Sequence, residues 1–240
     1  MKISFFSIFF FSFLLVSQKL FATALICEDL SAGSSTLKIK SNLILYGDLS
    51  SQEAQHWKQL IKRSIDQYWN QIPYQWEIKN RFYSIVTEVN VQYVDESKIR
   101  NLRDKYEQDY QFQFFRLHKG GSHSVTASFV LGHGRSGVLL LSDLEKSAST
   151  AAHEFGHTLG LAHPEEGPIV GRPGMMATQF YPVEEKYQGT DGKLNLSLRK
   201  VSKQELKNLN MEKFDWGLNP CHWLGQKASI FLFDHDLNVQ

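Results

Sequence analysis

The sequence lacks a strong surplus of charge of either sign. Over 240 residues, lysine and arginine number 26, and aspartate and glutamate number 25. Nucleic acid or an anionic membrane surface would call for a basic stripe. Only one group of basic residues resembles such a stripe, and we interpret it as the solvated face of a helix. Its members are Arg199, Lys200, Lys203, Lys207 and Lys213. We therefore expect no nucleic-acid partner.

The chain also has no internal repeats, no low-complexity tract and no long hydrophobic run beyond its N-terminus. Its composition, 42% hydrophobic and 21% charged residues, is that of ordinary globular material with enough apolar residues for a core. We predict one catalytic or binding domain of moderate size, which acts as a monomer.

The only long apolar run lies at the N-terminus, in residues 3–16. It is followed by Ala22, Thr23 and Ala24, which have the small-x-small spacing of a secretory cleavage site. We expect residues 1–24 to be a signal peptide and residues 25–240 to be the mature domain of a secreted, periplasmic or extracellular protein. An uncleaved anchor is the alternative, but the run is shorter than the roughly 20 residues of a spanning helix. We expect no stable membrane insertion after signal removal.

Cysteine is scarce, and only Cys27 and Cys221 are present. Both lie after the predicted signal peptide. In an exported protein, two cysteines most simply form one disulfide bond. We therefore predict a Cys27–Cys221 disulfide, which ties the start of the mature chain to a point near its end.

One short stretch of the sequence concentrates metal-binding groups. His153 and His157 are four residues apart, so on a helix both imidazoles face the same side and can reach one ion. Glu154 projects beside them and can contact a water at the metal without binding the metal itself. Gly160 can adopt the left-handed conformation that ends a helix, which brings His163 back as a third ligand. Three protein ligands with one open position are typical of a catalytic Zn²⁺ site.

This pattern, H-E-x-x-H-x-x-G-x-x-H, resembles that of the metzincin clan of zinc endopeptidases. The resemblance implies a methionine-containing turn beneath the metal, which Gly174-Met175-Met176-Ala177 fits. Met176 is favoured over Met175 because the family methionine usually follows an apolar residue. Some metzincins add a tyrosine ligand two residues later, but that position is Thr178 here. The alternative is a metal-free helix that carries three histidines.

The resemblance implies hydrolysis of protein or peptide substrates through one catalytic Zn²⁺, with Glu154 as the base. Two other functions stay open: a zinc-holding peptide-binding module without turnover, and a hydrolase that acts on cell-wall peptides. Some metzincins are kept latent by a cysteine thiolate on the zinc, so Cys27 as a latency ligand is the alternative to the disulfide. The usual cysteine-switch motif is absent.

Hydrophobic periodicity predicts the order of the elements. Strands are expected at residues 37–46, 85–94, 110–117, 124–130 and 138–141, and helices at 51–69, 96–108, 148–159 and about ten residues from Ser202. With the resemblance, this predicts an α+β fold with a twisted, mostly parallel five-stranded sheet and two helices. A smaller C-terminal subdomain, residues 164–240, would hold one further helix below residues 25–163.

The resemblance also makes one strand the antiparallel edge of the sheet beside the cleft, where an extended substrate pairs with it. The expected substrate-binding residues are Ser124, Val125, Thr126, Ala127 and Ser128. A plain hairpin without this role is the alternative. Three histidines around the neighbouring turns are a weaker candidate for a second, structural metal: His118, His123 and His133.

Overall fold

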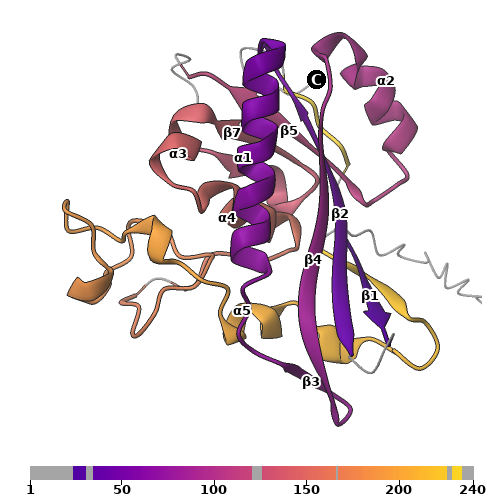
Figure 1. The fold of residues 1–240 in the computed structure, drawn as a ribbon, viewed down its shortest axis with the longest axis vertical. Coiled ribbons are helices and arrows are strands. Elements are labelled where there is room, and N and C mark those ends of the chain that lie inside the picture. The colour runs from indigo at the N-terminus through magenta and orange to yellow at the C-terminus, as the bar shows by residue number, and fades with distance from the viewer. Residues whose placement is uncertain (1–23, 31–34, 121–125, 166, 226–228, 234–240) are drawn as a thin grey trace, which may run out of the picture.

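The computed structural model describes residues 24–30, 35–120, 126–165, 167–225 and 229–233. Its centre is a mixed sheet of eight strands with five α-helices around it (Figure 1). The helices are α1 (Ser51–Trp69), α2 (Glu96–Tyr106), α3 (Leu141–Lys146), α4 (Thr150–Thr158) and α5 (Lys203–Asn208). The strands are β1 (Ala24–Asp29), β2 (Thr36–Tyr46), β3 (Trp76–Ile78), β4 (Arg81–Tyr93), β5 (Phe112–His118), β6 (Phe129–Val130), β7 (Ser136–Leu140) and β8 (Cys221–Leu224). The α+β class is therefore as predicted.

The sheet has a parallel centre. Strands β4, β2, β5 and β7 run parallel to one another, and β6 pairs antiparallel with β7 at one edge. Three further strands were not predicted. Strand β3 forms a hairpin with the start of β4. Strand β1 pairs with the N-terminal half of β2, and β8 pairs with β1. The prediction of five strands is thus wrong, because β3 and β8 are too short to show a hydrophobic period.

Strand β1 lies before the first predicted strand, which is β2. We placed the first strand at residue 37, but Ala24, the last residue of the predicted signal peptide, is the first residue of β1 and is fully buried. Residues 1–23, which hold the rest of that peptide, lie outside the described part of the chain. Within the described part, no helix combines the length and the apolar character needed to cross a membrane.

The Cys27–Cys221 disulfide is confirmed. Cys27 in β1 and Cys221 in β8 are direct partners in the antiparallel ladder, so the covalent bond joins two strands that already pair. Because its sulfur is in this bond, Cys27 is not a thiolate ligand in this structure. The C-terminal part of the predicted lower subdomain therefore returns to the sheet.

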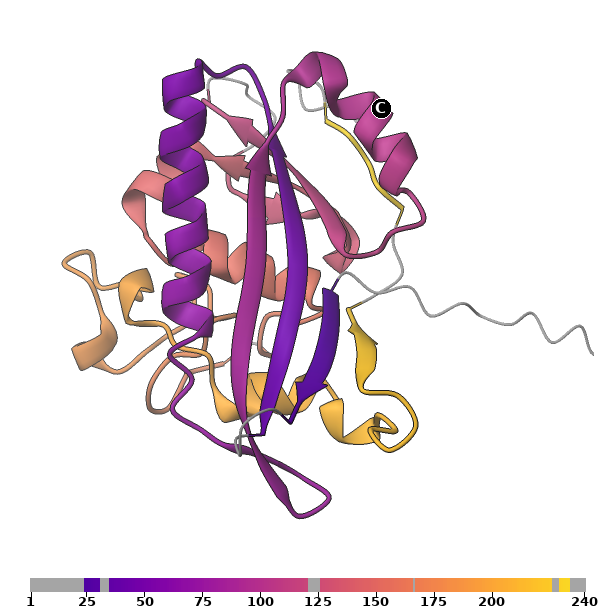
Figure 2. The same cartoon turned by 45° about the vertical axis from the view of Figure 1, so that its right-hand side comes forward.

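Helix α1 packs on one face of the sheet, and α2 with residues 229–233 covers the other, as Figure 2 shows. Ser50 and Glu53 form the predicted capping box at the start of α1. The inward face of this helix includes Trp57, Ile61 and Trp69. Burial of each such side chain contributes about 1.5–3 kcal/mol.

Helix α1 also holds α4 in place. The indole Nε1 of Trp69 donates a hydrogen bond to the carbonyl oxygen of Ala152 at 2.9 Å. Ser64 donates through its hydroxyl to the carbonyl of Ala148 and accepts from the backbone N–H of Ala152 at 3.2 Å. These bonds pair backbone groups at the start of α4 with buried side chains, so the helix that carries the histidines has a fixed position on the core.

Candidate metal centre

The three predicted histidines converge at the end of α4. His153 and His157 lie one turn apart and are each only 7% exposed. Gly160 has φ = 88°, the left-handed conformation expected at the end of the helix. The chain then turns back, and the Nε2 atom of His163 lies 3.2 Å from Nε2 of His153 and 3.0 Å from Nε2 of His157. Two ligands of a tetrahedral zinc ion are about 3.3 Å apart at ordinary Zn–N distances, so the spacing suits one ion.

The second nitrogen of each helical histidine lies against a backbone carbonyl. Nδ1 of His153 is 2.8 Å from the oxygen of Met175, and Nδ1 of His157 is 2.8 Å from the oxygen of Leu161. An Nδ1–H group that donates to these oxygens leaves the Nε2 lone pair free for a metal. Burial, and next the nearby Arg199 cation, lower the pKa of His153 well below 6.5, so this imidazole is neutral, as a ligand must be.

Glu154 lies next to the first histidine and is 5% exposed. Its Oε2 atom is buried and has no hydrogen-bond partner among the described residues. Burial raises the pKa of this carboxyl to about 8; Asp143 also raises it, while Arg199 opposes the rise. A buried acid with an unpaired oxygen is costly to keep, which is a mark of a functional site. The donor set and this oxygen fit a zinc ion with a reacting water beside it.

Met176 lies directly against α4 at Gly156. A Cβ atom at Gly156 would approach the Sδ atom of Met176 to 2.4 Å, so the lack of a side chain at this position makes room for the methionine. Met175 and Met176 are both fully buried. Met176 packs against the helix, and the carbonyl oxygen of Met175 lies against His153. Their role as the methionine turn of a zinc peptidase stays a prediction.

One supporting residue was recognised in the sequence only as a helix cap. Glu205 begins α5 in a capping box with Ser202, and its Oε2 accepts from the N–H of Ser202 at 2.7 Å. Its Oε1 accepts from the N–H of Met176 at 2.6 Å. The same oxygen would lie 2.6 Å from a Cβ at Gly174. Glu205 therefore holds the methionine turn, a contact across 29 residues that the sequence pattern does not reveal.

The predicted edge strand is shorter than expected. Strand β6 contains only Phe129 and Val130, which pair with Val138 and Gly137 of β7. Thr126, Ala127 and Ser128 are not in a strand, and Ser124 and Val125 lie outside the described residues.

A carboxylate of α3 explains where the strand begins. The backbone N–H of Ser128 donates to Asp143 at 2.7 Å, and the Ser128 hydroxyl accepts from the N–H of Leu140 at 3.0 Å. Because these bonds already occupy Ser128, the ladder begins at Phe129. Substrate binding at this edge stays a prediction.

The second metal site also stays a prediction. In the part of the chain that the structure describes, the three histidines of α4 and its turn are the only group of His, Cys, Asp or Glu side chains close enough to hold an ion. His118 accepts a hydrogen bond at Nδ1 from the N–H of Gly120. His123 lies outside the described residues, as does the side chain of His133.

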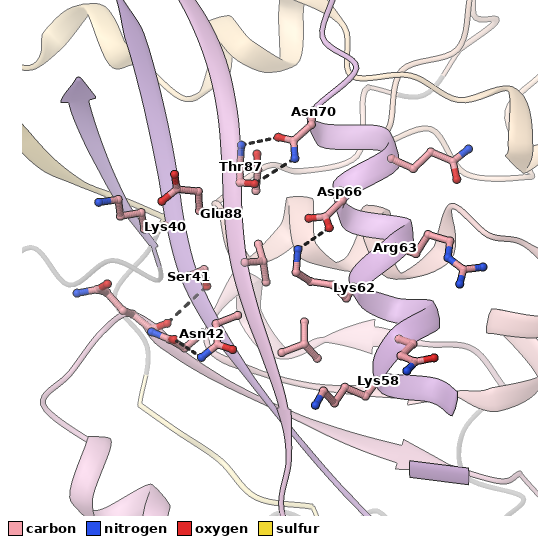
Figure 3. Close-up of a pocket in the computed structure, with 16 residues that line it drawn as sticks. Lys40, Ser41, Asn42, Lys58, Lys62, Arg63, Asp66, Asn70, Thr87 and Glu88 are labelled. Carbon is pink, nitrogen blue, oxygen red and sulfur yellow. Dashed lines mark hydrogen bonds and ion pairs between the residues drawn. The ribbon is translucent and has the colours of Figure 1, made fainter. Parts of the chain in front are cut away.

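A large hollow in the described surface is separate from this centre. It has a volume of about 1310 Å³ and lies between α1 and strands β2 and β4 (Figure 3). Most of the residues that line it have polar side chains, and they include a Lys62–Asp66 ion pair on α1. The side chain of Asn70 donates to the carbonyl of Thr87 and accepts from its N–H. None of the three histidines lines this hollow.

Comparisons with known proteins give no assignment. No family model matches the chain, and no curated protein matches it significantly.

Proposed function

We propose that this protein is a zinc-dependent endopeptidase of the metzincin type that acts on protein or peptide substrates. The observation that carries the proposal is the convergence of three histidine Nε2 atoms at the end of the helix that also carries Glu154, a buried carboxyl with an unpaired oxygen. A structural zinc site is closed by four protein ligands, whereas three ligands leave a position for chemistry.

The surroundings of the centre support the same function. Parallel strands followed by an antiparallel edge strand, and a methionine under the ligand helix, agree with what the resemblance implies. The disulfide agrees with secretion, because such bonds persist in oxidising compartments.

Each residue of the centre has a distinct role in the proposed reaction. A bound zinc ion supplies Lewis acidity, which polarises the substrate carbonyl and lowers the pKa of water towards about 7. Glu154 accepts the proton of the attacking water and then donates it to the leaving amine. Burial raises the pKa of Glu154 to about 8 in the zinc-free protein, and a bound cation nearby would favour the carboxylate form that a base requires. The Nδ1–H groups of His153 and His157 keep both rings oriented through their backbone acceptors.

An extended substrate would pair with the outer edge of β6. Because the N–H of Ser128 is held by Asp143, we assign the backbone pairing to Phe129 and Val130, and we assign the residues before them to the rim of the cleft. Main-chain bonds to such an edge hold any peptide, while side-chain contacts select its sequence.

Replacement of Glu154 by Gln tests the proposal. Gln keeps the shape of the side chain but cannot accept a proton, so we expect zinc content to be retained while cleavage of casein falls by about 10²–10⁴-fold or more. Wild-type cleavage should stop when a chelator removes the zinc. A Glu154→Gln protein that digests casein at the wild-type rate would refute the assignment. A wild type that binds zinc and a peptide library without cutting it would favour the peptide-binding module.

A further inference from the structure

Arg199 is not on a solvated helix face, as its sequence neighbours suggested. It lies before α5, in the segment after a short 3₁₀ turn (Leu196–Leu198), and is only 3% exposed. Lys203 and Lys207 of the same basic group are exposed, as predicted. The prediction is thus wrong for Arg199, whose guanidinium lies inside the protein.

The guanidinium joins three parts of the metal centre. Nε donates to the hydroxyl of Ser149, the N-cap residue of α4, at 3.1 Å. Nη1 donates to the carbonyl of Ala177 at 2.9 Å and, more weakly, to that of Met175 at 3.4 Å. The same Nη1 atom lies 2.7 Å from Nδ1 of His153. One rigid group therefore spans the start of the ligand helix, the methionine turn and the first ligand.

Nδ1 of His153 is close to both the Met175 oxygen and Nη1 of Arg199, and metal binding determines which of the two it can bond to. Coordination through Nε2 requires the proton on Nδ1, and that Nδ1–H donates to the Met175 oxygen at 2.8 Å. Arg199 has only donors, so it cannot bond to the same nitrogen in that state. Its effect on the ligand must then pass through the backbone carbonyls that it holds.

A buried guanidinium is expensive unless it is well bonded. In the described part of the chain no carboxylate forms a salt bridge with Arg199, so backbone and hydroxyl oxygens satisfy it instead. The planar fork of arginine can reach the N-cap of α4 and the methionine turn together, whereas the single ammonium of lysine cannot. This geometry is what a role in positioning needs.

We propose that Arg199 is a positioning residue of the metal centre, whose fork fixes the Met175–Ala177 backbone against α4 and thereby orients the ring of His153 for coordination. The inference rests on the proposed function only in taking His153 as a metal ligand. It does not require that the protein cleave peptides.

The test compares Arg199→Met and Arg199→Lys with Arg135→Met. Arg135 is a matched control because it is also buried and its guanidinium is also held by neutral oxygens, the backbone carbonyls of Tyr106, Glu107, Asp109 and Phe112. Zinc affinity is measured by competition with a chelator, ligand geometry by the visible absorption of Co²⁺-substituted protein, and folding by thermal melting.

We expect both Arg199 variants to bind zinc about 10–100-fold more weakly, the usual effect of losing a group that orients a ligand, and to change the Co²⁺ absorption band. Arg135→Met should lower the melting temperature but leave zinc affinity and the Co²⁺ band unchanged. If Arg199→Met does not fold, Ser149→Ala removes the hydroxyl that accepts from Nε and that donates to the Leu196 carbonyl. It leaves Nε with the Leu196 carbonyl at 3.3 Å and leaves the contacts of Nη1 in place, so zinc binding should weaken by a smaller factor.

Three results would overturn the inference. The first is a folded Arg199→Met protein, or Ser149→Ala protein, with wild-type zinc affinity and absorption. The second is full recovery in Arg199→Lys, which would assign the effect to charge instead of the fork. The third is a wild type that binds no metal, which would also remove the proposed function. Zinc binding without proteolysis in the wild type would refute the proposed function alone and leave the role of Arg199 intact.

Discussion

Helices α4 and α5 each carry one buried glutamate, and the two carboxyl groups have opposite environments. Glu205 on α5 is 8% exposed, and each of its oxygens accepts a backbone N–H, from Met176 and Ser202. Glu154 on α4 is 5% exposed, and its Oε2 has no partner among the described residues. The comparison distinguishes an acid that holds the structure from an acid that is available to react. Burial alone does not make this distinction, because the two groups are buried to a similar extent.

The largest difference between the two acids is expected in the pH dependence of the zinc-free protein. Because burial raises the pKa of Glu154 from 4.5 to about 8, folding favours its protonated form. Its contribution to the free energy of unfolding is complete below about pH 4.5 and is lost as the pH rises towards 8. At 1.36 kcal/mol per pKa unit the loss is at most roughly 5 kcal/mol.

Urea denaturation of zinc-free protein from about pH 5 to about pH 8.5 measures this loss. Glu154→Gln cannot titrate, so the variant should lose less stability over this range and should exceed the wild type at the alkaline end. If the two proteins followed the same pH profile, Glu154 would be solvated or paired when folded, and the contrast with Glu205 would disappear.

The same replacement at Glu205 should have the opposite sign. Gln can accept only one of the two backbone N–H groups, and its amide N–H₂ would face the other, so Glu205→Gln should lower the free energy of unfolding by about 1–3 kcal/mol. The free energy of unfolding of both variants should be measured near pH 8. Relative to the wild type, Glu154→Gln should gain stability and Glu205→Gln should lose it. A stable Glu205→Gln protein would show that the methionine turn does not depend on this carboxylate.

The smallest effect concerns the contact between Gly156 of α4 and Met176. An added methyl group in Gly156→Ala would meet the Sδ atom of Met176 at 2.4 Å. Since the contact is with the flexible end of a side chain, we expect a loss of stability of about 1 kcal/mol, at the low end of overpacking costs. The loss should vanish in a Met176→Ala background, and a double-mutant cycle measures that coupling. Additive effects would mean that Met176 does not pack against this face of α4.

The metal centre could be predicted from the sequence because its geometry is local. A spacing of four residues on one helix and a glycine at its end suffice to bring His153, His157 and His163 together. The supports of the centre could not be predicted in this way. Arg199 and Glu205 act on it across 46 and 29 residues, and their neighbours in the sequence indicate only a basic surface and a helix cap.

The fold shows the same difference between local and long-range features. The long strands β2 and β4 and the amphipathic helix α1 show clear periods and were predicted within a few residues. Strand β8 was missed because its four residues are too few to show a hydrophobic period, and β1 was missed because its pairing with β8 spans almost the whole chain. The start of β6 was misplaced because a side chain, Asp143, takes the N–H of Ser128, and no hydrophobic pattern records that bond.

Under the proposed function, the disulfide has a further consequence, because a peptidase can cut copies of itself. It joins residues 194 positions apart, so almost every exposed loop of the folded domain lies inside the covalent ring, including the irregular segment between His163 and α5. A single cut in any of these loops would leave two fragments still linked through Cys27 and Cys221, with the sheet pairing intact. Autolysis would then yield a nicked, two-chain form that migrates as one species until it is reduced.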